Sequence, residues 1–206
     1  MNTKDIKYWV ILTGTTGLLG QTIKTELMKR GFGVIGLGRK KNNFDKISNF
    51  QYFKCDISNK EDISKLFEKI NKLNIFALIN NAGIQGPIGM FEENNFSHWM
   101  ESIQTNFIGP VMMIKKFLKL NIDKGYIVNI SGGGATKPME YFSSYAAAKT
   151  ALVRFTETLS IELKNKKIKT LAIAPGFLSS DFHKPILEGK VNLPGYIAEE
   201  IIKKFK

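Results

Sequence analysis

Six short, continuously apolar runs alternate along the chain with longer segments of helical pattern. The apolar runs lie at residues 8–14, 33–38, 50–56, 75–83, 125–131 and 168–176. Helical patterns lie at about 17–30, from Ser58 onward, at about 96–120 and at 143–164. Apolar strands that alternate with helices are typical of a parallel sheet that is covered on both faces. The pattern therefore predicts an α/β domain with a doubly wound parallel sheet, whose ligands bind beyond the carboxyl ends of the strands.

Two of these helices carry capping signals at their start. Ser58 and Glu61 have the spacing of a capping box, which predicts that Ser58 caps the helix that follows. Ser143 or Ser144 is expected to cap the helix over 143–164.

Length and composition predict one domain over residues 1–206. The apolar fraction of 43% is ordinary for a globular protein and allows a sizeable core. The one cysteine, Cys55, excludes an internal disulfide and suits a reducing compartment. The first apolar run is too short for a signal peptide, and no later stretch could span a membrane. We therefore expect a cytoplasmic protein.

The formal net charge of +12 raises the question of an anionic partner. The lysines are spread along the chain, with small clusters only at 164–169 and 203–206. No stretch interleaves aromatic and basic residues in the way of a nucleic-acid stacking platform. Nucleic acid is therefore not the expected partner. A nucleic-acid-associated protein remains an alternative, which salt-dependent retention of an oligonucleotide would reveal.

The first apolar run ends in a glycine-rich turn, TGTTGLLG, at residues 13–20. Its glycines allow a tight turn, close approach of the backbone to a diphosphate, and close packing of helix on strand. The amino terminus of the next helix then points free N–H groups at the anion. In this setting the turn predicts a Rossmann-type dinucleotide site rather than a plain turn. The residues expected to bind are Gly14, Thr16, Gly17, Leu18, Leu19 and Gly20.

The residues after the second apolar run predict which coenzyme binds. An acidic residue there would accept hydrogen bonds from a ribose diol, but this chain has Gly38 followed by Arg39, Lys40 and Lys41. A guanidinium can bind a 2′-phosphate with two hydrogen bonds, so NADP(H) is preferred over NAD(H). The alternative is a basic surface loop. After the third run, Asp56 and Ile57 are expected to flank the adenine.

Tyr145 and Lys149 lie four residues apart in a predicted helix, with three alanines between them. Residues at this spacing share one face of a helix. A nearby ammonium and the positive charge of an oxidised nicotinamide both stabilise a phenolate, so we expect Lys149 and the coenzyme to lower the pKa of Tyr145 and make it usable in acid–base chemistry. The alanines leave room for a nicotinamide riboside. Without other motifs, an incidental pair on an exposed helix would be the better interpretation.

The chain resembles the short-chain dehydrogenase/reductase family along nearly all of its length. The resemblance lies in motifs that follow the family's order: TGTTGLLG, CDIS (55–58), NNAG (80–83), TNFIG (105–109), NIS (129–131), YAAAK (145–149) and APGFLSS (174–180). It implies that Tyr145 is the general acid for carbonyl reduction and the base for alcohol oxidation. Lys149 would bind the nicotinamide ribose, Ser131 would hydrogen-bond the substrate oxygen, and Asn106 would hold a water in a proton relay.

The resemblance also implies further coenzyme contacts. Asn81, Ala82 and Gly83 would line the adenosine side of the cleft. The nicotinamide side would be lined by Pro175, Gly176, Leu178 and Ser180. No metal site is expected, because His98 and His183 have no acidic or metal-ligand partner at a recognisable spacing.

Three features depart from the family's shorter-chain branch. The glycine spacing is that of the branch of epimerases and dehydratases, which keeps a nucleotide-sugar epimerase as an alternative. Ser131 and Tyr145 are one residue further apart than usual, so residues 132–142 are expected to bulge into the substrate pocket. The family's final strand is absent after Gly176, where a lid (177–192) and a helix (193–206) are expected instead. This leaves a homo-oligomer, dimer or tetramer, open, and keeps an NADP(H)-binding regulator without turnover as an alternative.

The sequence therefore predicts an NADP(H)-dependent oxidoreductase that interconverts a carbonyl and an alcohol on a small molecule. The mixture of polar and aromatic residues in the loop 132–142 and the lid favours a small polar substrate, and a sugar-type substrate is the hypothesis that we carry forward.

Overall fold

The computed structural model describes residues 6–41, 47–120 and 122–175. The predicted lid and final helix, together with Gly176, Leu178, Ser180 and His183, lie outside the described residues.

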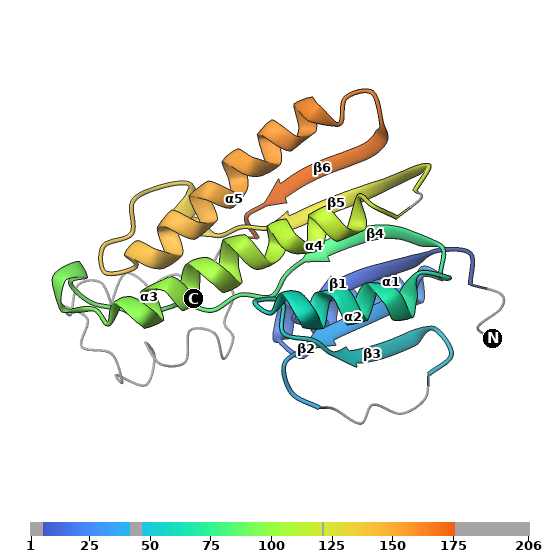
Figure 1. The fold of residues 1–206 in the computed structure, drawn as a ribbon, viewed down its shortest axis with the longest axis horizontal. Coiled ribbons are helices and arrows are strands. Elements are labelled where there is room, and N and C mark those ends of the chain that lie inside the picture. Colours follow the sequence, from blue (N-terminus) through green and yellow to red (C-terminus); the bar gives the residue numbers. More distant parts are fainter. Residues whose placement is uncertain (1–5, 42–46, 121, 176–206) are drawn as a thin grey trace.

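The described residues form one six-stranded sheet in the order β3-β2-β1-β4-β5-β6, in which every neighbouring pair is parallel (Figure 1). The strands are β1 (Trp9–Thr13), β2 (Gly33–Gly38), β3 (Phe50–Lys54), β4 (Ile75–Asn80), β5 (Lys124–Ile130) and β6 (Lys167–Ile173). The strand order reverses between β1 and β4, so the switch point of the sheet lies between their carboxyl ends. The predicted doubly wound α/β fold is confirmed.

Helices pack on both faces of this sheet. Helix α1 (Leu18–Lys29) contacts β1 and β2, where its side chains Ile23, Leu27 and Met28 pack against Leu12 of the sheet. On the other face, α2 (Lys60–Ile70) packs beside α4 (Gly109–Phe117), and α5 (Ser143–Glu162) lies on β5 and β6. Helix α3 (Phe96–Ile103) packs against α5.

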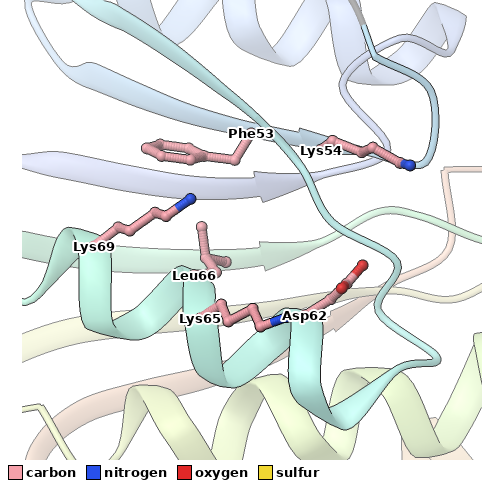
Figure 2. A pocket seen from close by; sticks show the side chains of 6 residues that line it. All are labelled: Phe53, Lys54, Asp62, Lys65, Leu66 and Lys69. Carbon is pink, nitrogen blue, oxygen red and sulfur yellow. The ribbon is translucent and has the colours of Figure 1, made fainter.

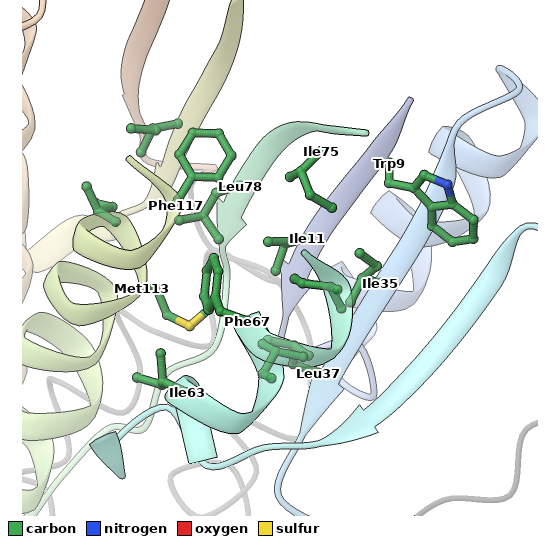
Figure 3. Close-up of a cluster of buried hydrophobic side chains, with 14 of the residues drawn as sticks. Trp9, Ile11, Ile35, Leu37, Ile63, Phe67, Ile75, Leu78, Met113 and Phe117 are labelled. Atoms are coloured by element: carbon green, nitrogen blue, oxygen red, sulfur yellow. The ribbon is translucent and has the colours of Figure 1, made fainter. Parts of the chain in front are cut away.

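The larger core lies between the sheet and helices α2, α4 and α5 (Figure 3). Ile11 of β1 points into it, whereas its neighbour Leu12 points toward α1, because successive strand residues face opposite sides of a sheet. Both side chains are fully buried. Because both faces of the sheet are buried, the strands appear in the sequence as continuously apolar runs. The buried side chains also set the register of neighbouring strands, and hence the position of their carboxyl ends.

The structure corrects both predicted helix caps. The side chain of Asn59, not Ser58, accepts the capping hydrogen bond of α2, from the Asp62 amide at 2.9 Å. The Ser58 hydroxyl instead donates to the Asp56 carboxylate at 2.7 Å. The N-cap of α5 is Phe142, which makes no side-chain capping bond, so neither Ser143 nor Ser144 caps this helix.

The long helix predicted over 96–120 is interrupted. A π-helical turn, η3 (Gln104–Ile108), separates α3 from α4. π-helical turns are rare in proteins, but those that occur are often found at functional sites. No helix within the described residues is both long and apolar enough to cross a membrane.

Candidate active site

The glycine turn after β1 packs tightly against the loop after β4. Gly14 has φ +67°, and a Cβ placed on it would lie 2.8 Å from the Cα of Ala82. A Cβ on Gly20 would collide with the Gly14 carbonyl, so α1 lies directly on the turn. By contrast, a Cβ on Gly17 would meet nothing closer than 3.6 Å. Two of the three glycines are therefore required by close packing of the chain on itself, and Gly17 is exposed at the surface of the turn.

The amino terminus of α1 is suited to an anion. Its N-cap, Gly17, makes no side-chain capping bond, and the first turn contains no acidic residue. The first N–H groups of a helix need acceptors, and a helix amino terminus favours negative charge. Thr16, Gly17 and Leu18 of this turn are exposed, Leu19 is partly buried and Gly20 is buried. The turn therefore fits the diphosphate of a dinucleotide.

Thr13 is a residue of this site that the sequence analysis missed. Its hydroxyl oxygen accepts hydrogen bonds from the backbone N–H groups of Asn81 and Ala82, both at 2.9 Å. The Asn81 side chain donates in return to the carbonyl oxygens of Thr13 at 3.0 Å and of Gly14 at 3.1 Å. The ends of β1 and β4 are thus locked together. The available signal was a hydroxyl residue at the end of an apolar strand, directly before Gly14.

The basic residues Arg39 and Lys40 are exposed immediately after β2. The Tyr52 hydroxyl donates to the Lys40 carbonyl at 2.8 Å, which holds this segment against β3. After β3, the Asp56 carboxylate accepts from the backbone N–H of Ser58 at 2.9 Å as well as from its hydroxyl. Ile57 is only 4% exposed and packs in the larger core, and its expected place beside the adenine stays a prediction.

Tyr145 and Lys149 lie in the first two turns of α5, beside the end of β5. The Lys149 ammonium donates to the Ile130 carbonyl at 2.8 Å and lies 5.7 Å from the centre of the Tyr145 ring. A Cβ on Gly132 would collide with the Tyr145 hydroxyl, so this hydroxyl lies directly over the backbone that follows Ser131. The structure therefore brings the predicted tyrosine, lysine and serine segments together.

Burial governs the pKa values of this pair in the protein alone. It raises the pKa of Tyr145 to about 12 and lowers the pKa of Lys149 to about 8. The expected lowering of the tyrosine pKa by Lys149 together with an oxidised nicotinamide stays a prediction.

The Ser131 hydroxyl is buried and has no hydrogen-bond partner among the described residues. A buried polar atom without a partner is costly, and such atoms are rare in native proteins. Ser131 directly precedes Gly132, over whose backbone the Tyr145 hydroxyl lies. Ser131 is therefore available to hydrogen-bond a ligand at this point.

Asn106 lies at the centre of the π-helical turn and is fully buried. Its side chain donates to the Ile84 carbonyl at 2.7 Å and accepts from the Ile84 amide at 2.9 Å. It also donates to the Ser102 hydroxyl at 3.0 Å. The amide group thus fixes the loop after β4, and the predicted role in holding a relay water stays a prediction.

Gly83 connects the coenzyme side of the site to the catalytic side. A Cβ on Gly83 would lie 2.8 Å from the Asn106 side-chain oxygen and 3.6 Å from the Lys149 nitrogen. Pro175 is exposed just beyond β6. Within the described residues, no group of three histidine, cysteine or acidic side chains could hold a metal ion, and His98 is exposed.

A cavity of about 80 Å³ lies away from this site, between β3 and α2 (Figure 2). Its lining residues are Phe53, Lys54, Asp62, Lys65, Leu66 and Lys69. Sites for cofactors and drug-sized ligands typically enclose several hundred Å³. This cavity is too small for a dinucleotide and contains none of the predicted catalytic residues.

Comparison with known proteins identifies the family. A family model described as short chain dehydrogenase matches residues 8–190. Farnesol dehydrogenase from Aedes aegypti is 30% identical to this chain over 199 residues, which cover 87% of this chain and 81% of that enzyme.

Solved structures of two enzymes share the fold. An actinorhodin polyketide ketoreductase with NADPH superposes with a TM-score of 0.86 at 26% identity, over 97% of this chain and 81% of that one. A 4-hydroxyisoleucine dehydrogenase complexed with NADH superposes with a TM-score of 0.76 at 24% identity, over 91% of this chain and 83% of that one. The second likeness concerns the fold alone.

Proposed function

Because the chain belongs to the short-chain dehydrogenase family, we propose that it interconverts a carbonyl and an alcohol with a nicotinamide coenzyme. One observation carries the proposal. The buried Lys149 ammonium lies 5.7 Å from the centre of the partly buried Tyr145 ring, at the strand end that carries the unpartnered Ser131 hydroxyl.

The chemistry that a nicotinamide coenzyme supplies when bound is a hydride, delivered to or taken from the substrate carbon. In the reductive direction, the Tyr145 hydroxyl would give its proton to the carbonyl oxygen. The Ser131 hydroxyl would donate a hydrogen bond to the same oxygen and stabilise its developing charge. The Lys149 ammonium would stabilise the phenolate that remains. Burial raises the pKa of Tyr145 to about 12, so the phenol is protonated at neutral pH but is a weak acid, and the positive charges of Lys149 and of a bound oxidised coenzyme would lower this pKa toward the working range.

We further propose that NADP(H) is preferred over NAD(H). Family membership leaves this open, since one structural neighbour carries NADPH and another NADH. The support comes from the end of β2, where Gly38 replaces an acidic residue and Arg39 and Lys40 are exposed. A guanidinium at this point offers two parallel N–H donors to a phosphate, which an ammonium cannot do.

Fluorescence titrations with NADPH and NADH on the wild type and Arg39→Ala test this preference. We expect Arg39→Ala to weaken NADPH binding about 10-fold or more, because a charge-assisted hydrogen bond is lost, and to leave NADH binding nearly unchanged. Arg30→Ala is the matched control, since Arg30 pairs with Glu26 at the far end of α1. Equal affinities for the two coenzymes in all three proteins would refute the assignment.

The predicted small polar, sugar-type substrate is also retained as a proposal. Lys137 and Glu140 are exposed in the loop between β5 and α5, which supports a polar substrate. The relatives described above are a dehydrogenase and a ketoreductase by name, so the epimerase alternative has only the glycine spacing in its favour.

A further inference from the structure

The end of β2 is packed closely against a tyrosine of β3. The two strands run parallel, with Gly36 opposite Tyr52 and Gly38 opposite Lys54. The Tyr52 side chain leans along its strand, so that a Cβ on Gly38 would collide with the Tyr52 hydroxyl oxygen. Gly38 does not have a positive φ, so the backbone conformation alone does not require glycine there. The Tyr52 hydroxyl is what leaves room only for glycine at the end of β2.

The same hydroxyl holds the chain that follows Gly38. It donates a hydrogen bond to the Lys40 carbonyl at 2.8 Å. The Gly38 carbonyl accepts a hydrogen bond from the Cys55 amide at 2.9 Å. Arg39 therefore lies between two backbone carbonyls, each of which accepts a hydrogen bond from β3 or from the residue directly after it. Arg39 itself is exposed, so its backbone is held in place while the residue stays accessible to a ligand.

The surroundings of Tyr52 suit it to this role. Burial raises the pKa of Tyr52 above its ordinary value, so the phenol keeps its proton and remains a donor at neutral pH. The side chain is partly buried and packs against the smaller buried cluster of Leu12, Val34 and Phe50. An anchored backbone reduces the entropy that is lost when a surface side chain binds a ligand. The Tyr52 hydroxyl therefore organises the segment around Arg39 before any ligand arrives.

We propose that Tyr52 is a positioning residue for the choice of coenzyme. Its hydroxyl holds Arg39 in place for the 2′-phosphate of NADP(H), and it excludes from position 38 the acidic side chain that would bind a ribose diol. The inference rests on the proposed preference for NADP(H) and names the residue of the neighbouring strand that enforces it. Both effects come from one oxygen atom, so Tyr52→Phe removes both.

Fluorescence titrations with NADPH and NADH on Tyr52→Phe test the positioning effect. We expect the affinity for NADPH to fall about three- to tenfold, because one hydrogen bond is lost, and the affinity for NADH to change by less than about twofold. The ratio of the two affinities is the diagnostic quantity, since a general loss of structure would lower both alike. Tyr126→Phe, at an exposed tyrosine on β5, is the matched control and should leave the ratio unchanged.

A double-mutant cycle shows whether Tyr52 acts through Arg39. In an Arg39→Ala background, Tyr52→Phe should cause little further loss of NADPH affinity, because the effects of residues that act as one unit do not add. An unchanged ratio in Tyr52→Phe, an equal loss for both coenzymes, or the same loss with and without Arg39 would each overturn the inference. A ratio that stays unchanged in Arg39→Ala would refute the preference for NADP(H) itself, and the inference with it.

Gly38→Ala tests the exclusion effect without any coenzyme. Its Cβ would collide with the Tyr52 hydroxyl, whereas the nearest ring carbon lies 3.4 Å away, which is an ordinary contact. We expect Gly38→Ala to lower the melting temperature by about 3 °C in the wild-type background and by less than about 1 °C in a Tyr52→Phe background. Equal losses in the two backgrounds would overturn the claim that the hydroxyl keeps side chains out of position 38.

Discussion

The hydroxyl groups on the coenzyme side and on the catalytic side of the candidate site are paired differently. On the coenzyme side, hydrogen-bonding groups are paired with one another: Thr13 accepts from two backbone amides, and Asn81 donates to two backbone carbonyls. On the catalytic side, the buried hydroxyls of Ser131 and Ser144 have no partner among the described residues. The buried Lys149 ammonium donates one hydrogen bond among the described residues, to the Ile130 carbonyl.

This difference indicates what each side contributes. Paired groups give a rigid turn whose shape is set before any ligand arrives. Unpaired buried groups lower stability, but they retain hydrogen-bonding capacity for a ligand. A site that positions a dinucleotide with one side and performs proton transfer with the other would need this division. The following substitutions test whether the division holds.

Tyr145→Phe should have the largest effect. Removing the hydroxyl removes the proton donor, so we expect kcat to fall about 10³-fold while the affinity for the coenzyme changes less than threefold. Steady-state NADPH oxidation and a fluorescence titration measure the two quantities. Tyr126→Phe, on the exposed part of β5, is the control and should behave as the wild type. Retention of most of the turnover in Tyr145→Phe would remove this residue from the mechanism.

The pH dependence of the free energy of unfolding should show that burial of the Lys149 ammonium costs more hydration than its protein contacts replace. Its pKa is about 8 in the folded protein and 10.5 ordinarily, so between these values the unfolded chain binds more protons. The free energy of unfolding should therefore rise with pH, on the order of 2 kcal/mol from pH 8 to pH 10. Tyr145 acts in the opposite sense at higher pH: its pKa is raised from 10.0 to about 12, so stability should fall as pH rises through that range.

Urea unfolding at intervals from pH 7 to pH 10 measures this slope. Lys149→Met should abolish the rise, whereas Lys119→Met, at an exposed position after α4, should keep it. A wild-type slope equal to that of Lys149→Met would mean that the lysine is better hydrated than its burial indicates.

Local sequence patterns predicted most of the fold. The features that they did not predict depend on contacts between residues that are far apart in the sequence. All six strands appear where continuously apolar runs occur. The run 75–83 extends beyond β4, which ends at Asn80, because Asn81 and Ala82 turn away to bind Thr13. The π-helical turn was not predicted either, since it accompanies the bonds between Asn106 and Ile84, 22 residues apart.

The same rule applies to the site. The Tyr145–Lys149 pair was predictable because its geometry depends on helical spacing alone. Thr13 was missed because its importance depends on Asn81, which is far away in sequence. The raised pKa of Tyr145 could not be read from the residues, since it depends on how deeply the phenol is buried. The cytoplasmic location and the oligomeric state remain predictions.

The smallest expected change in the free energy of unfolding distinguishes the coenzyme side from the catalytic side most directly. Thr13→Val preserves shape but leaves the amides of Asn81 and Ala82 without their acceptor, which should cost about 1.5 kcal/mol of unfolding free energy. Ser131→Ala removes a hydroxyl that has no partner in the described structure, so stability should change by less than about 0.5 kcal/mol.

Urea unfolding of both variants measures these differences, with Thr158→Val on the exposed face of α5 as the control for the hydroxyl-to-methyl change. Turnover should change in the other order, falling about 100-fold in Ser131→Ala because a hydrogen bond to the reacting oxygen is lost. Equal losses of stability in the two variants would show that Ser131 has a partner in solution. The Ser131 hydroxyl would then be paired as the Thr13 hydroxyl is, and it would have to exchange that partner for the substrate in every turnover.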